Sequence, residues 1–178
     1  MDAWLKIRKL NGQVYLNHEK GILILQKGKE MKRYMAEQDT IKLLRECDAG
    51  TKMGIASMEN VMDYIHDDSF RKSLSNSKNS HEKLRKEIEA LLDTYHEDGK
   101  EPTPVAKSMS WMKTSVKLIM NESDKTIAGL MTDGCNMGVK TLNGYLNQYT
   151  AADKKSKDIA RRLIDIEEKL AADMRKYL

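Results

Sequence analysis

Acidic residues and histidines at helical spacing are the first candidates for chemistry in this sequence. Two such triplets occur, Glu59, Asp63 and His66 in the first and Glu89, Asp93 and His96 in the second. Residues at i, i+4 and i+7 share one face of a helix, where carboxylates and an imidazole can bind a metal ion. A turn near residue 68 would make the two helices antiparallel and place the triplets about 40 Å apart. We therefore expect no shared site and interpret both triplets as solvated charges.

One histidine, His81, falls on the apolar side of its helical pattern. The same turn places it level with Gly54, and a missing side chain there would leave room for a ligand, a water or a metal ion. A di-iron bundle needs Glu-x-x-His on two helices. The residue three before His81 is Lys78, and the last predicted helix has Glu167 and Glu168 but no histidine. We expect His81 to be satisfied by a hydrogen bond to a hydroxyl, a carbonyl or a water.

Asp48 is the second polar residue on the predicted inner side, and Asp48 and His81 are the two candidates for metal ligands. In the antiparallel register it lies level with Glu87, about 9 Å along the axis from His81. One ion could not bind both without distortion. Apart from Thr51, the remaining mid-helix positions are apolar or glycine, including Leu163, Ile166 and Leu170 on the last helix. The sequence therefore predicts a dry, mostly apolar centre with no cofactor.

The two cysteines, Cys47 and Cys135, are far apart and belong to no CxxC pair, so a zinc site has no support. Both lie in apolar helical patterns and are predicted to be buried thiols, with a reactive redox pair as the alternative. Glycines four residues apart accompany both, at Gly50 and Gly54 and at Gly134 and Gly138. Each glycine costs helix stability, so we expect close packing between these two helices.

The elements that must position these residues are helical. Apolar residues recur at three and four from Asp39 to about His66, and Asp67-Asp68-Ser69 indicates the cap of a second helix ending before Gly99. Pro102 and Pro104 break the chain before a short helix over 105–120, in which Trp111 is expected to pack on the bundle. Further helices are predicted over Lys125 to about Tyr149 and from Asp153 to the end. The result is an all-α, up-down four-helix bundle with one long crossover and ferritin-like topology.

Residues 1–38 read as a separate, basic N-terminal segment, with the bundle domain over residues 39–178. Val14–Leu16 and Ile22–Leu25 are separated by a polar stretch with a glycine, which is typical of a small hairpin. A second interpretation is that part of residues 1–34 comes from untranslated DNA that has been read as protein. Lys27-Gly28-Lys29-Glu30 can be encoded by purine-rich codons that resemble a ribosome-binding sequence.

Composition agrees with a single helical domain. The chain has 178 residues, of which 40% are hydrophobic, 33% charged and 6% aromatic, and its twelve methionines can fill core gaps. Residues 1–38 hold eight of the 31 basic and four of the 27 acidic residues, which leaves 23 of each sign in residues 39–178. A neutral bundle disfavours nucleic-acid binding. Without a signal peptide or a long apolar run, we expect a cytoplasmic protein without membrane association.

A resemblance adds to this reading. Asp48, Gly54, Ser110-Trp111-Met112-Lys113, the segment Asp133–Val139 and Tyr145 make residues 39–178 similar to uncharacterised bacterial ferritin-like proteins common in clostridia. The wider ferritin-like group is expected to have a glutamate and a histidine where this chain has Cys135 and Met109. The resemblance therefore implies a ferritin-like bundle from which the di-metal ligands are missing.

These observations predict a non-catalytic helical bundle that acts by binding or assembly. A homodimer is expected, because a methionine-rich chain has adaptable apolar surface. The alternative is a metal- or oxidant-handling protein that uses His81, Cys47 and Cys135 in an atypical site.

Overall fold

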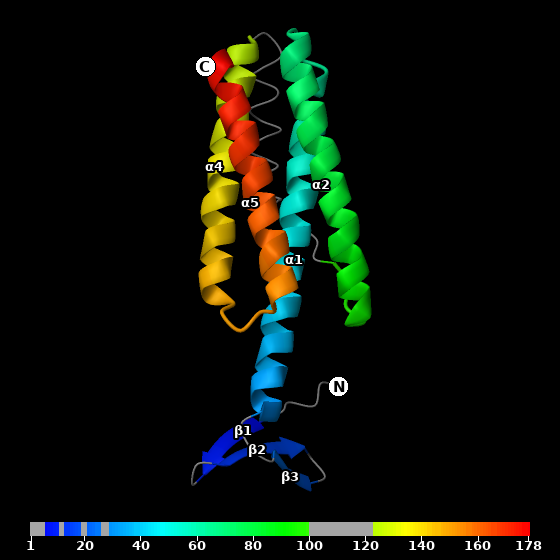
Figure 1. Ribbon diagram of the computed structural model, residues 1–178, viewed down its shortest axis with the longest axis vertical. Coiled ribbons are helices and arrows are strands. Elements are labelled where there is room, and N and C mark those ends of the chain that lie inside the picture. The colour runs from blue at the N-terminus through cyan, green and yellow to red at the C-terminus, as the bar shows by residue number, and fades with distance from the viewer. Residues whose placement is uncertain (1–5, 11–12, 19–20, 26–28, 100–122) are drawn as a thin grey trace.

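The computed structural model describes residues 6–10, 13–18, 21–25, 29–99 and 123–178. Four long helices pack into a bundle, and a three-stranded sheet lies beyond one end, next to the start of the first helix (Figure 1). The helices are α1 (Lys29–Met62), α2 (Asp68–Thr94), α4 (Asp124–Gln148) and α5 (Lys154–Met174). A short 3-10 helix, η1 (Arg175–Tyr177), follows α5.

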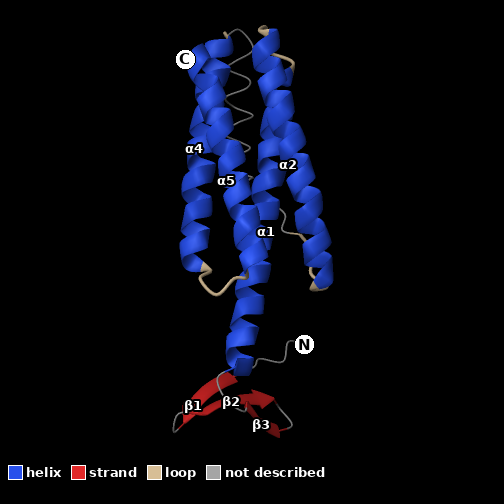
Figure 2. Ribbon diagram, in the orientation of Figure 1, coloured by secondary structure: helices blue, strands red, loops and turns tan. Residues whose placement is uncertain are grey.

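The sheet is antiparallel in the order β1 (Lys6–Leu10), β2 (Gln13–His18) and β3 (Gly21–Leu25) (Figure 2). Strands β2 and β3 form the hairpin expected from the sequence, with Val14 opposite Leu25 and His18 opposite Gly21. Strand β1 was not predicted. Three of its five residues are basic, so the sequence lacks the alternation of apolar and polar residues that indicates a strand. The strand is recognised only by its pairing with β2.

Helix α1 begins at Lys29, ten residues before the predicted start at Asp39, and ends at Met62. Tyr34 and Met35 in its first turns are about half exposed, with relative exposures of 54% and 53%. The apolar stripe that predicts the helix begins only at Asp39, where α1 reaches the other helices, so the earlier turns carry no periodic signal. The additional turns extend past the α4–α5 connection toward the sheet (Figure 1).

The predicted cap of α2 is confirmed, and α5 begins with a cap of the same kind at the predicted boundary residue Asp153. Asp67 Oδ1 accepts a 2.7 Å hydrogen bond from the Phe70 N–H, and Asp153 Oδ1 accepts one of 2.7 Å from the Ser156 N–H. These bonds satisfy amide groups that the first turn of a helix leaves unpaired.

The cap of α4 differs from this pattern. Ser123 is the N-cap residue, but its side chain makes no capping hydrogen bond. The carboxylate of Asp124 instead accepts hydrogen bonds of 2.9 and 2.8 Å from the N–H groups of His66 and Asp67. It therefore ties the start of α4 to the α1–α2 turn.

These contacts define the direction of each helix. The α1–α2 turn lies at the end of the bundle where α4 begins, and the N–H groups of Ala151 and Asp153, in the α4–α5 connection, bond Asp39 and Thr40 near the opposite end. Helices α1 and α5 therefore run one way, and α2 and α4 run the other way (Figure 1). The connection from α2 to α4 joins opposite ends of the bundle. The predicted helix over 105–120, with Met109 and Trp111, lies outside the described residues.

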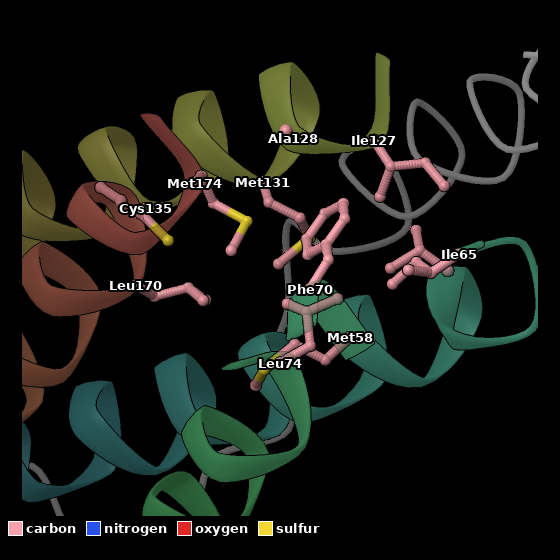
Figure 3. Close-up of a cluster of buried hydrophobic side chains, with 12 residues drawn as sticks. Met58, Ile65, Phe70, Leu74, Ile127, Ala128, Met131, Cys135, Leu170 and Met174 are labelled. Carbon is pink, nitrogen blue, oxygen red and sulfur yellow. The ribbon is translucent and has the colours of Figure 1, made fainter. Parts of the chain in front are cut away.

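The core consists of two apolar clusters, one toward each end of the bundle. The cluster beside the α1–α2 turn contains Phe70, Leu74, Met131, Cys135 and Leu170 among its members (Figure 3). The second cluster contains Leu43, Cys47, Leu84, Leu142 and Leu163, among others. No helix among the described residues is both long and apolar enough to cross a membrane.

Candidate functional site: a polar layer at the bundle centre

A layer of polar side chains separates the two apolar clusters. On α2, Ser77 and His81 lie between Leu74 of one cluster and Leu84 of the other, and on α5 Glu167 lies between Leu163 and Leu170. The side chain of His81 is 1% exposed and that of Glu167 is 13% exposed. Their closest atoms, His81 Nε2 and Glu167 Oε1, are 3.1 Å apart.

Both nitrogens of the His81 ring have partners in the chain. Nδ1 lies 2.9 Å from the carbonyl oxygen of Ser77, one turn earlier on α2, and Nε2 faces Glu167. A carbonyl oxygen can only accept, so Nδ1 carries a proton and donates it. The expectation that a hydroxyl, a carbonyl or a water would satisfy His81 is therefore confirmed at Nδ1, whereas the carboxylate at Nε2 was not expected.

The hydrogen bond between His81 Nε2 and Glu167 Oε1 requires a second proton, on one of these two atoms. An ionised carboxylate can only accept a hydrogen bond, so with Glu167 ionised the proton lies on Nε2. Burial alone lowers the pKa of His81. The hydrogen bond that His81 donates to Glu167, the negative charge of Glu167 and the hydrogen bond to the Ser77 carbonyl outweigh burial, and the net effect raises the pKa of His81 above 6.5. The geometry therefore favours an imidazolium paired with a carboxylate.

Glycines on two helices make room for this pair. A Cβ atom added at Gly54 of α1 would lie 2.8 Å from Nε2 and 2.9 Å from Cδ2 of His81. One added at Gly138 of α4 would lie 3.5 Å from Cδ of Glu167. The sequence correctly placed His81 level with Gly54, but the space is filled by the imidazole ring itself and not left for a ligand.

Glu167 is the residue that the sequence analysis missed. It lies four residues after Leu163 and three before Leu170, so it falls on the buried stripe of α5. Ile166, which was predicted to face the centre, is only half-buried. The prediction of an apolar centre on this helix is therefore wrong at Glu167, because a carboxylate can occupy a buried position when a cation is paired with it.

Cys135 of α4 borders the layer. Burial is the main cause that raises the pKa of its thiol, and the charge of Glu167 and a hydrogen bond with it raise the pKa further. For Cys47, burial and the charges of Glu46 and Asp48 raise the pKa to about 12. Both thiols are thus held in the neutral form, which is a poor nucleophile. They belong to different apolar clusters, so the structure does not bring them together.

Asp48 is fully buried but belongs to a different group of residues from His81. Lys52 Nζ lies 3.0 Å from its Oδ2 and Arg85 Nε lies 4.0 Å from its Oδ1, in charge contacts that lack hydrogen-bond geometry. Gly99, beyond the end of α2, packs so close that an added Cβ would lie 2.3 Å from Oδ2. The negative charge of Asp48 therefore faces two basic side chains, and Asp48 lies against Gly99. These contacts do not involve His81, in agreement with the predicted separation of the two residues.

The two surface triplets are not assembled into a site. Glu59 pairs with Lys78 at 2.8 Å and His66 faces Asp124 at 3.5 Å, whereas Glu89 pairs with Arg85 at 2.9 Å. Across the residues that the structure describes, no group of three or more His, Cys, Asp and Glu side chains is placed to hold a metal ion. Ser77 Oγ is buried and has no hydrogen-bond partner within the same residues.

Comparisons of this chain with protein-family models, curated proteins and solved structures gave no match.

Proposed function

We propose that this chain is a ferritin-like helical bundle that acts by binding or assembly and not by catalysis. The observation that supports this best is the closed state of its central polar layer. Both ring nitrogens of His81 are engaged by groups of the same chain, and the space beside Gly54 is occupied by the ring. The polar residue best placed for chemistry thus has its bonding capacity used internally.

The directions of the helices support the ferritin-like assignment. Helix α2 packs against α1 and α5, helix α4 packs against α5 and α1, and each of these pairs is antiparallel. One long connection joins α2 to α4 from one end of the bundle to the other. This up-down-down-up order is the connectivity of ferritin-like bundles. Because one fold hosts many activities, the connectivity alone assigns no chemistry.

Surface side chains support a role in binding or assembly. Among the residues whose burial the structure describes, four large apolar ones are about half exposed, namely Tyr34, Met35, Met137 and Leu178. Exposed methionine adapts its shape to a partner, because its side chain is unbranched and polarisable. The raised pKa values of both cysteines weigh against the alternative in which thiolates handle an oxidant.

Metal analysis of the intact protein tests this proposal. The protein is purified without chelators and without a histidine tag, and its metal content is measured together with that of His81→Leu. We expect less than one equivalent of transition metal per chain and no loss on substitution. A stoichiometric metal content that disappears in His81→Leu would overturn the proposal in favour of the metal-handling alternative.

Thermal unfolding of His81→Leu adds a second measurement. Replacing only the histidine leaves the carboxylate of Glu167, which is 13% exposed, inside the bundle without its cation, so we expect a clear loss of stability. The double variant His81→Leu/Glu167→Leu removes both charges and is expected to regain part of that loss. Equal stability of all three proteins would mean that the pair is not buried as described.

A further inference from the structure

Helix α4 contains fewer charged residues than α1, α2 or α5. Only four of the 25 residues of α4 are charged, and two of these lie in its first turn. In α5, eleven of 21 residues are charged. We give the name α4 surface to six exposed residues in the middle of this helix, namely Asp133, Asn136, Met137, Lys140, Thr141 and Gly144. Met137, at its centre, is 52% exposed.

The two charges of the α4 surface are opposite in sign and symmetrically placed. Asp133 and Lys140 are seven residues apart, which is about 10 Å along the axis and nearly two full turns, so they share one side of the helix. The point midway between them falls between Asn136 and Met137. Neither charge has an ion-pair partner within the residues that the structure describes.

We propose that the α4 surface is a self-association surface, on which a second copy of this chain packs its own α4 antiparallel across a twofold axis near Met137. Such an axis makes residues at equal distances from the midpoint face each other, so Asp133 of each copy faces Lys140 of the other. Two ion pairs then flank the two Met137 side chains. This inference rests on the proposed assembly role and names the surface that carries it.

The same features argue against other occupants. A nucleic acid or another surface of one sign would meet Asp133 or Lys140 as a like charge, whereas a second copy satisfies both. The size of the surface indicates a reversible dimer. A helix of 25 residues is about 37 Å long, so a strip about 10 Å wide is ~370 Å² from each copy, compared with ~800 Å² in a standard interface.

Charge exchange between two variants tests this arrangement sharply. Asp133→Lys places lysine against lysine in its own dimer, and Lys140→Asp places aspartate against aspartate. We expect each variant to self-associate at least tenfold more weakly than the parent chain in sedimentation velocity over a range of concentrations. An equimolar mixture of the two variants restores both opposite-charge pairs, so we expect heterodimers in the mixture. The double variant Asp133→Lys/Lys140→Asp is also expected to dimerise.

A matched pair of methionine variants provides the control. Met137→Glu puts two carboxylates at the axis and is expected to weaken association, whereas Met35→Glu changes an equally exposed methionine on α1 and should leave it unchanged. Circular dichroism checks that each variant keeps its helix content.

A parent chain that stays monomeric at every concentration would overturn the inference, as would a mixture of the two charge variants that stays monomeric. A dimer that no substitution weakens would also overturn it, while leaving assembly through another surface open. The metal measurement on His81→Leu tests the proposed function separately, so the two failures are distinguishable.

Discussion

Replacing Gly54 by alanine examines the central layer most directly, because it adds one methyl group against the imidazole of His81. In an open helix, glycine to alanine stabilises by about 1 kcal/mol. Here the new Cβ would lie 2.8 Å from Nε2 and 2.9 Å from Cδ2, closer than real Cβ atoms approach other atoms. The ring must move, although the Ser77 carbonyl and Glu167 hold both of its nitrogens.

The net effect follows from the balance of these contributions. Overpacking a filled core costs about 1–3 kcal/mol, and losing a hydrogen bond to a charged group costs about 1.5–3 kcal/mol. The two costs together are about 2.5–6 kcal/mol, and subtracting the helix-propensity gain of about 1 kcal/mol leaves a predicted destabilisation of about 1.5–5 kcal/mol for Gly54→Ala. For a chain of this size, that corresponds to a fall in Tm of about 3–20 °C.

Gly50, one turn earlier on the same helix, is the matched control. A Cβ at Gly50 would meet only Leu163 Cδ2 at 3.5 Å, an ordinary contact, so Gly50→Ala is expected to stabilise by up to about 1 kcal/mol. Urea unfolding followed by circular dichroism measures both variants. If Gly54→Ala were as stabilising as Gly50→Ala, the imidazole of His81 would not lie where the structure places it.

Three further outcomes can be measured on single variants or on the parent chain. His81 has a raised pKa in the fold, so its contribution to stability is fully present below about pH 6.5 and is lost as the pH rises through the raised value; in Glu167→Gln, NMR titration should find the pKa of His81 lower than in the parent. His96 has a φ of 55° in the left-handed region at the end of α2, so His96→Gly should raise the free energy of unfolding by about 0.5–1 kcal/mol in urea titrations, and a loss would contradict this conformation. Cys47 and Cys135 should resist alkylation by iodoacetamide at pH 8 in the folded protein and react fully in urea, whereas fast labelling of the native chain would mean that the thiols are accessible.

The buried pair of His81 and Glu167 also bears on how the bundle is specified. Apolar clusters on either side of it could pack in shifted registers with little loss, because hydrophobic burial has no direction. A histidine that must meet one carboxylate on α5 and one glycine on α1 penalises such shifts, since each would bury a charge without its partner. The double variant His81→Leu/Glu167→Leu, followed by NMR, should show whether the helices then sample several packings.

Much of the local structure was determined by the sequence alone. The four helices, the caps at Asp67 and Asp153 and the β2–β3 hairpin follow from periodicity and from side chains that bond to amides two or three residues away. That His81 and Gly54 lie at the same height along the bundle axis followed from counting residues on each side of the α1–α2 turn, because both helices rise by the same amount per residue. Such features depend on neighbours within a few turns, and the sequence contains those neighbours.

Partner choice between distant segments was decided only by the tertiary structure. Glu167 and His81 form a hydrogen bond although they are 86 residues apart in the sequence. The carboxylate of Asp124 accepts hydrogen bonds from the α1–α2 turn, 57 and 58 residues away, and not from an N–H group of its own helix. In the sequence, Glu167 is one of two adjacent glutamates on a charged helix, and nothing local distinguishes the buried one from the exposed one. A carboxylate is stable inside the bundle only once a cation and hydrogen-bond donors surround it, and that environment exists only after all four helices have packed.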